Sequence, residues 1–415
     1  MTFGNLTRWL LLLGLAAAAI MPRHATAANG AADRAPAAWP MHTIDNSSRG
    51  ADGVRLRDVN GDGLPDIATG WEEGGLVRIY LNPGPRKVRE PWPAVTVGEV
   101  ASPEDAVFAD LDGDGAVDVV SSCEGKTRSI FFHWAPSEKE RYLDPAAWRT
   151  QALSPSAGMT QWMFALPLSI DGKNGIDLVA GAKGEDAQIG WWESPRDPRD
   201  VKAWKWHPLY DAGWIMSLAA HDMDGDGDLD VVASDRYSKT SGSLWLENPG
   251  PERAAKGRWR EHRIGAAGGH VMFLKVADLD QDGLDDVVVT TRDRKVVYHR
   301  RTQASPARWE SHEIPFEPNT GTGKGVAVAD IDLDGKTDLA LTFSNAKEDK
   351  TAVTWLSYRG SPTSADWSAH EIGGLAGIKF DRIEMLDLDQ DGDLDLITCE
   401  ERDNLGVIWY ENPTR

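Results

Sequence analysis

The sequence has little cysteine, little positive charge and few long apolar segments. Two cysteines in 415 residues exclude a disulfide-stapled scaffold. Lys and Arg number 44 against 65 Asp and Glu, which gives a formal net charge of −21. This imbalance disfavours electrostatic capture of nucleic acid or of an anionic membrane. A composition with 41% apolar residues also excludes a disordered chain and collagen, and supplies enough material for a large core.

The one long apolar run, Trp9 to Met21, lies near the N-terminus, after Arg8 and before the small-residue pattern Ala25-Thr26-Ala27. A bilayer span needs about 20 apolar residues, so this shorter run predicts a cleaved signal peptide over residues 1–27. Residues 28–38 are expected to form a disordered leader, and residues 39–415 the folded domain. We therefore expect a secreted monomer, periplasmic or extracellular, without a membrane span.

A nonapeptide, DxDxDGxxD, recurs along the whole chain and is each time followed by a β-branched run. It starts at Asp58, Asp110, Asp222, Asp278, Asp330 and Asp387, and a degraded copy covers residues 169–177. Two further patterns run in phase with it. A Trp-x-x-His pattern carries His42, His207, His262, His312 and His370, and WxE[NS]P occurs at residues 191–195, 245–249 and 409–413. Each unit is about 55 residues long.

Each unit offers four short apolar runs separated by Gly, Asn and Pro, and none shows a helical period. Four strands repeated seven times predict an all-β fold, a seven-bladed β-propeller of four-stranded blades. The first Trp-His strand, residues 39–44, precedes the first Asp loop, and the last unit ends without one. We therefore expect the N-terminal strand to complete the last blade and close the ring, which would remove exposed sheet edges.

The Asp loops carry the strongest chemical signal. Oxygen ligands at positions 1, 3, 5 and 9 with Gly at position 6 are typical of a Ca²⁺ site, and the absence of Glu at position 12 excludes an EF-hand. The predicted ligands are Asp58, Asn60, Asp62 and Asp66; Asp110, Asp112, Asp114 and Asp118; Asp222, Asp224, Asp226 and Asp230; Asp278, Asp280, Asp282 and Asp286; Asp330, Asp332, Asp334 and Asp338; and Asp387, Asp389, Asp391 and Asp395. We expect six structural Ca²⁺ ions, with a metal-free third loop because Ser169 and Lys173 replace two ligands.

These loops, in seven units from residue 39 to 413, resemble the FG-GAP or VCBS repeat family. That family includes integrin α-subunit propellers, a fungal lectin and many secreted bacterial proteins, and the resemblance implies a calcium-binding propeller. The Phe-Gly and Gly-Ala-Pro parts of the family pattern are mostly absent, so integrin-like ligand recognition is not implied. The family also includes the propeller of fungal aldos-2-ulose dehydratase, an enzyme with additional cupin domains.

If the Asp loops occupy one face of the disc, residues that depart from the repeat at the opposite channel mouth are candidates for binding a ligand. These are Glu104, Asp105, Glu124, Lys126, Gln161, Trp162, Lys183, Trp214, Asp235, Arg236, His270, Lys324, Lys379 and Glu400. Aromatic side chains ringed by hydrogen-bonding groups favour a carbohydrate. A sugar lyase or dehydratase at this face, with His270 and Glu104 or Asp235 as an acid–base pair, and a protein–protein adhesion module remain as alternatives.

The repeated histidines lie on five different blades and cannot converge on one site, so we expect them to form structural hydrogen bonds. Cys123 and Cys399 lie in units separated by the first blade, which predicts free thiols.

Overall fold

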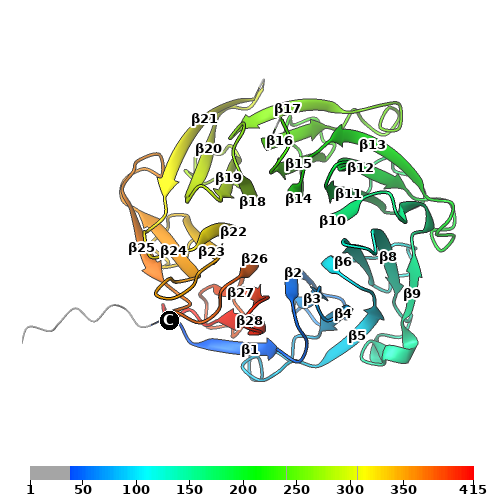
Figure 1. The fold of residues 1–415 in the computed structure, drawn as a ribbon, viewed down its shortest axis with the longest axis horizontal. Coiled ribbons are helices and arrows are strands. Elements are labelled where there is room, and N and C mark those ends of the chain that lie inside the picture. The colour runs from blue at the N-terminus through cyan, green and yellow to red at the C-terminus, as the bar shows by residue number, and fades with distance from the viewer. Residues whose placement is uncertain (1–37, 240, 306) are drawn as a thin grey trace, which may run out of the picture. The chain divides into compact units, whose positions relative to one another are not determined.

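The structure, a computed structural model, describes residues 38–239, 241–305 and 307–415. The predicted signal peptide, and the predicted leader up to residue 37, lie outside these residues. Residues 38–415 form one compact unit. Its strands make seven four-stranded antiparallel sheets, which Figure 1 shows as blades around a central channel. The predicted all-β, seven-bladed propeller is confirmed.

In blades 1 to 6 the strands run outward from the channel in chain order. Blade 1 holds β2 (Ala51–Arg57), β3 (Asp66–Trp71), β4 (Leu76–Tyr80) and β5 (Ala94–Glu99); blade 2 holds β6 (Pro103–Ala109), β7 (Asp118–Cys123), β8 (Ser129–Trp134) and β9 (Arg149–Ala152); blade 3 holds β10 (Gln161–Leu168), β11 (Asp177–Lys183), β12 (Gln188–Glu193) and β13 (Lys205–Asp211). Blade 4 holds β14 (Ile215–His221), β15 (Asp230–Asp235), β16 (Gly242–Glu247) and β17 (Arg260–Gly265); blade 5 holds β18 (Val271–Ala277), β19 (Asp286–Thr291), β20 (Lys295–Gln303) and β21 (Arg308–Pro315); blade 6 holds β22 (Thr322–Ala329), β23 (Asp338–Ser344), β24 (Val353–Tyr358) and β25 (Trp367–Glu371).

Blade 7 combines the two ends of the described chain. Its inner strands are β26 (Phe380–Leu386), β27 (Asp395–Glu400) and β28 (Gly406–Tyr410), and its outermost strand is β1 (Met41–Asp45). Strand β1 pairs antiparallel with β28, with His42 opposite Trp409. Ile44 is 1% exposed and packs with blade 1 and blade 7 residues. The predicted closure of the ring by the N-terminal strand is therefore confirmed.

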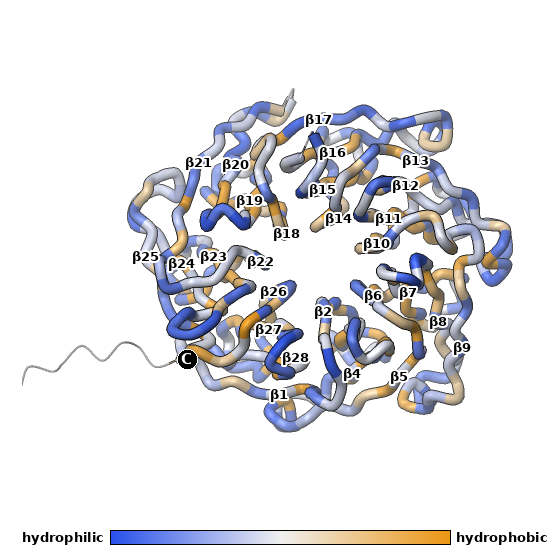
Figure 2. Tube along the Cα trace, viewed as in Figure 1, coloured by the Kyte–Doolittle hydropathy of each residue, from blue (hydrophilic) through white to orange (hydrophobic). Residues whose placement is uncertain are grey.

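The core lies between the faces of neighbouring blades, because apolar side chains from one sheet pack against the next. Second strands such as β19 are buried along their whole length, which explains their β-branched sequence, Val287 to Thr290. Outer strands such as β21 alternate and are mostly hydrophilic (Figure 2). The described residues contain only three single-turn 3-10 helices, η1 (Lys139–Arg141), η2 (Pro145–Ala147) and η3 (Ser154–Ser156), and no helix among them could cross a membrane.

The histidines of the outer strands have structural partners. His262 stacks on Trp245 at 4.0 Å between ring centroids, and its Nε2 lies 2.6 Å from a carboxylate oxygen of Glu247. His42 in blade 7 and His207 in blade 3 make the same two contacts. Each stacks on the Trp of the WxE[NS]P motif in its blade and lies within hydrogen-bond distance of the Glu of that motif. The prediction of structural hydrogen bonds is confirmed for these three and for His370, whose Nε2 lies 2.8 Å from Ser357 Oγ. It is wrong for His312, whose Nε2 is buried without a hydrogen-bond partner beside the Tyr298 ring. Cys123 and Cys399 are buried free thiols, as expected.

Candidate functional site

Each Asp loop joins the first and second strands of its blade, so by the repetition of the blades all seven lie on one face of the ring. Backbone amides orient the carboxylates. The amide of the Gly at position 6 donates to position 1 in all six intact loops, for example Gly283 to Asp278 at 2.9 Å. Asp280 in turn accepts from the amide of Asp282 at 3.3 Å. Backbone amides of the loop itself therefore help to orient these oxygens.

Several loop oxygens fit a cation. Acidic oxygens of Asp110, Asp112 and Asp118 lie within 4.8 Å of one another, as do those of Asp222, Asp224 and Asp230. At position 1 of three loops one carboxylate oxygen is buried and has no hydrogen-bond partner: Asp110 Oδ1, Asp330 Oδ1 and Asp387 Oδ1. A buried, unpartnered carboxylate oxygen is costly. Hard oxygen ligands of this kind are those that Ca²⁺ prefers, so the residues present fit that ion.

Position 9 has a second role. Asp118 accepts from the amide of Leu111 within its loop, at 3.1 Å, and from the amide of Ala135 at the end of the third strand, at 2.8 Å. Asp66, Asp230, Asp286 and Asp395 bridge the loop to the third strand in the same way. Burial, opposed by these hydrogen bonds, raises the pKa of Asp118 to about 8. Position 9 thus anchors the loop to its blade.

The degraded third loop keeps this anchor. Asp177 accepts from the amides of Ile170 and Ser194, both at 2.9 Å. The Lys173 ammonium lies 2.9 Å from the Asp171 carboxylate, where the other loops offer an acidic side chain at position 5. Arginines approach the outer oxygens of three other loops: Arg199 contacts Asp112, Arg300 contacts Asp280, and Arg89 contacts Asp389.

On the opposite face, the channel mouth forms a cavity of about 280 Å³ lined by residues from all seven blades. Its floor is aromatic. Phe164 from blade 3 and Phe273 from blade 5 meet edge to face, with 5.8 Å between ring centroids. Lower in the channel, Lys275 of blade 5 pairs with Glu384 of blade 7 at 3.1 Å. These contacts cross the channel between blades that are not neighbours, and a further cavity of about 300 Å³ lies lower in the channel beside Arg55 and Glu384.

One half of this cavity, on blades 7, 1 and 2, is acidic. Asp52, Asp381 and Glu401 lie together, and the Lys324 ammonium is 2.5 Å from Asp381. Burial, together with the charges of Asp381 and Glu401, raises the pKa of Asp52 well above its usual value. Burial opposes ionisation of Asp381 too, but the Lys324 ammonium holds its pKa below the usual value. Asp52, Asp381 and the Lys324 ammonium therefore lie close together, with the pKa of Asp52 raised and that of Asp381 lowered.

The other half, on blades 3, 4 and 5, is cationic and apolar, with Met163, Met216 and Met272 beside the phenylalanines. The Arg236 guanidinium lies 3.8 Å from the centroid of the Trp214 ring. Lys183 lies 4.6 Å from the same ring and pairs with Glu104 at 3.0 Å. Burial, and then the positive charge of Arg292, lower the pKa of Arg236.

The structure brings half of the fourteen predicted ligand-binding residues into this cavity: Glu104, Glu124, Lys183, Trp214, Arg236, Lys324 and Lys379. The other seven are placed outside it. Asp105 forms a two-bond ion pair with Arg55 lower in the channel, and Lys126 is exposed on a turn. Gln161 begins β10 without lining the cavity, and Trp162 is fully buried between blades.

Asp235, Glu400 and His270 are the remaining three. Asp235 accepts from the amides of Gly213 and Trp214, and Glu400 from five backbone amides, so both carboxylates hold the rim together. His270 lies 3.8 Å from Asp293 and edge-on to Tyr237. The expected acid–base pairing of His270 with Glu104 or Asp235 is therefore not formed, because Asp235 is turned into the rim and Glu104 pairs with Lys183.

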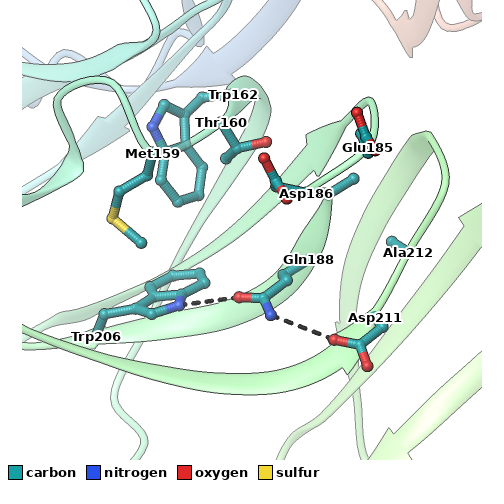
Figure 3. Close-up of a pocket in the computed structure, with 10 residues that line it drawn as sticks. Met159, Thr160, Trp162, Glu185, Asp186, Gln188, Trp206, Asp211 and Ala212 are labelled. Atoms are coloured by element: carbon teal, nitrogen blue, oxygen red, sulfur yellow. Dashed lines mark hydrogen bonds between the residues drawn. The ribbon is translucent and has the colours of Figure 1, made fainter.

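A second cavity on the same face, of about 370 Å³, lies on blade 3 away from the channel (Figure 3). Trp162 and Trp206 pack edge to face, at 5.3 Å between centroids, at one end. Trp206 Nε1 donates to Gln188, which donates to Asp211. Gly190 permits this arrangement, because a Cβ there would lie 2.4 Å from the Trp206 ring. Lys183 and Trp214, which are bridged and line the central cavity, lie two residues along the chain from Glu185 and Ala212 of this second cavity.

Sequence reasoning did not include several residues of the central cavity in the predicted site: Asp52, Met163, Phe164, Met216, Met272, Phe273, Ser344, Asp381 and Arg402. The apolar ones fit the strand pattern and so were indistinguishable from core positions. Asp52 and Asp381 were findable, since each is an acid at the first-strand position where three other units have Met163, Met216 and Met272.

The comparisons with known proteins agree with the fold. A family model described as an FG-GAP-like repeat matches residues 58–121 and 278–341. Among solved structures, a crystal structure of BBS1N in complex with ARL6DN, soaked with mercury, is similar with a TM-score of 0.51 and 11% identity, over 91% of this chain and 98% of that one. None of the curated proteins matches. Similarity at this identity shows the fold alone. The expected resemblance is confirmed: the chain is a seven-bladed β-propeller built with FG-GAP-like repeats.

Proposed function

We propose that this protein is an exported, Ca²⁺-stabilised propeller that binds a carbohydrate on the face opposite its Asp loops, as a monomer. The observation that carries the proposal is the central cavity, in which residues from all seven blades surround the aromatic pair Phe164 and Phe273. Concave sites with an apolar lining and a few converging polar groups are typical of small-molecule binding. An FG-GAP propeller supports a ligand-binding module in general terms, and the sugar is our proposal.

Two features favour an oligosaccharide over a smaller ligand. Lys183 and Trp214 of the central cavity lie two residues along the chain from Glu185 and Ala212 of the blade 3 cavity, so one extended molecule could contact both. The blade 3 cavity offers an indole, Trp206, with Gln188 and Asp211 beside it. An aromatic face flanked by hydrogen-bonding side chains suits a sugar ring, which has apolar C–H faces and polar edges.

The metal part of the proposal rests on the six intact loops. Their position 1 carboxylates include three buried oxygens without a partner, and Ca²⁺ would neutralise charge that the protein alone leaves crowded. Asp58, Asp110, Asp222, Asp278, Asp330 and Asp387 would each contribute, with the acidic or amide residues at positions 3, 5 and 9. When bound, the ion would tie together loops that otherwise repel themselves.

A glycan array with the purified propeller tests the carbohydrate assignment. We expect binding to at least one glycan, weakened by Trp206→Ala and by Trp214→Ala but not by Tyr358→Phe, a conservative change outside both cavities. Binding that survives both Trp variants, or no binding to any glycan, contradicts the proposal and favours protein–protein adhesion instead.

A second candidate, a sugar lyase or dehydratase in the same cavity, is favoured by the acidic half. Asp52, whose pKa is raised, could act as a general acid, and the adjacent Asp381, whose pKa is lowered, as a general base. An ultraviolet assay for unsaturated products separates the two functions. A rise in absorbance that Asp52→Asn abolishes identifies a lyase, whereas glycan binding without turnover identifies a binding protein.

A further inference from the structure

Arg236 and Arg292 are the two basic side chains in the lining of the central cavity that form no ion pair with a carboxylate of the described residues. Arg236 is 5% exposed, and its Nε is buried without a hydrogen-bond partner. The nearest polar contact of its Nη1 is the weakly accepting Met272 sulfur, at 3.3 Å. Among residues 38–239, 241–305 and 307–415, no carboxylate lies within ion-pair distance of Arg236 or of Arg292.

This arrangement is unfavourable in the unligated protein. A guanidinium that loses its water without gaining a carboxylate costs several kcal/mol in general. Contact with the Trp214 ring at 3.8 Å and the Tyr237 ring at 4.6 Å recovers part of that cost, roughly 0.5–2 kcal/mol. The neighbouring Arg292 adds repulsion instead of relief. By contrast, Lys183, Lys324 and Lys379 in the same cavity all have carboxylate partners.

We infer that the ligand of the central cavity carries a carboxylate, which Arg236 and Arg292 bind, so that the sugar is an acidic one such as a uronate. The inference rests on the proposed carbohydrate function and names its substrate class. The planar guanidinium fork matches the two oxygens of a carboxylate. A dianion such as phosphate is disfavoured, because Glu72, Glu104 and Asp52 line the facing half.

The facing half complements the rest of such a ligand. Hydroxyl groups of a uronate could donate to Glu104 or Asp381 while its ring lies over the floor formed by Phe164 and Phe273. The cavity would therefore bind both ends of one molecule. Blades 4 and 5 would bind its anionic group, and blades 7, 1 and 2 would accept hydrogen bonds from its hydroxyl groups.

Matched polysaccharides test the inference. Polygalacturonate, alginate and hyaluronan are each compared with their carboxyl-reduced forms, which keep the sugar backbone and lose the charge, and a sulfated galactan is the control for other anions. We expect wild-type protein to bind at least one carboxylated form, and its reduced form at least about tenfold more weakly. Arg236→Gln and Arg292→Gln should each abolish that preference.

Arg49→Gln is the matched control variant, because Arg49 is 74% exposed, lies 3.3 Å from Glu73 and lines neither cavity. It should change the preference for the carboxylated polysaccharide little.

Arg236→Lys keeps the positive charge but loses the planar guanidinium fork, and it should still weaken binding. Unligated Arg236→Gln should melt no lower than wild type, since it removes an unpaired buried charge, and this separates loss of binding from loss of fold.

The outcomes are distinguishable. Equal binding of carboxylated and reduced forms, or a preference for the sulfated galactan, overturns the carboxylate inference and leaves carbohydrate binding standing. If no polysaccharide binds, the proposed function fails, and thermal shift with sodium acetate and sodium benzoate decides the subsite. Stabilisation that Arg236→Gln removes supports a carboxylate site for another ligand, and no stabilisation overturns it.

Discussion

His133 and His299 occupy the same third-strand position in blades 2 and 5, and each is fully buried. His133 bonds the hydroxyls of Ser121, at 2.9 Å, and Thr150, at 2.8 Å. The rings are accommodated by glycines on the outer strand of the preceding blade. A Cβ at Gly98 would lie 2.2 Å from the His133 ring, and one at Gly265 would lie 2.4 Å from the His299 ring. Glycine is thus required here for close approach between blades.

Acid should therefore destabilise the fold through His133. Burial lowers its pKa to about 3, against an unperturbed value near 6.5. The unfolded chain binds the extra proton between these values, so this contribution to stability is complete above pH 6.5 and is lost as the pH falls towards 3. Between pH 7 and pH 5, wild type should lose about 2 kcal/mol more than His133→Gln, as measured by urea unfolding in excess Ca²⁺. The half-exposed His270→Gln should behave as wild type, and equal slopes for wild type and His133→Gln would falsify the assignment.

Among the structural elements of a blade, the Asp loop and the strand that carries the WxE[NS]P motif are joined into one hydrogen-bonded unit. In blades 3, 4 and 7 the Trp of that motif stacks on the outer-strand His and the Glu bonds the same His. The amide of the Asn or Ser then donates to the position 9 Asp of the loop. The motif therefore links the second, third and fourth strands, which explains why loop three keeps Asp177 after losing other ligands.

The anchoring and metal-binding roles can be separated by mutation. Asp177→Ala removes two backbone hydrogen bonds and should cost about 3 kcal/mol whether or not EGTA is present. Asp278→Ala should lower the free energy of unfolding more in Ca²⁺ than in EGTA, because only in Ca²⁺ does the substitution remove a metal ligand. Ser169→Ala should cost little in either buffer. Denaturant unfolding of the three variants measures these differences, and an EGTA-sensitive cost for Ser169→Ala would contradict a metal-free third loop.

The elements of this fold were predictable because a strict period places every loop and strand, including β1 in blade 7. The direction of the side chains at the channel mouth was not predictable from that period. The register shifts within the first strand of every blade, in blade 2 between Pro103 and Asp105. A bulge at this point changes which of two neighbours faces the channel. Glu104 therefore lines the cavity, whereas Asp105 faces Arg55 below it.

For the whole molecule, the acidity and the closed ring act together. The formal net charge of −21 includes 23 aspartates at the loop ligand positions, all on one face. Six bound Ca²⁺ ions would offset about half of that charge and bind only the folded state. EGTA should therefore lower the melting temperature by roughly 10 °C or more, and excess Ca²⁺ should restore it. Differential scanning calorimetry measures the shift, and a melt unaffected by chelation would remove calcium from the proposal.

Pairing of β1 with β28 also constrains when the molecule can finish folding. During synthesis, residues 41–45 emerge long before residues 406–410, so the first strand has no partner until the segments of the other six blades have been made. Six blades can assemble from contiguous segments as they appear, but the seventh cannot. A nascent chain released before residue 406 would leave β1 unpaired and blade 7 incomplete, with open edges that other chains could bind. Chains truncated within β28 should therefore aggregate, because both β1 and β27 then lack a neighbouring strand.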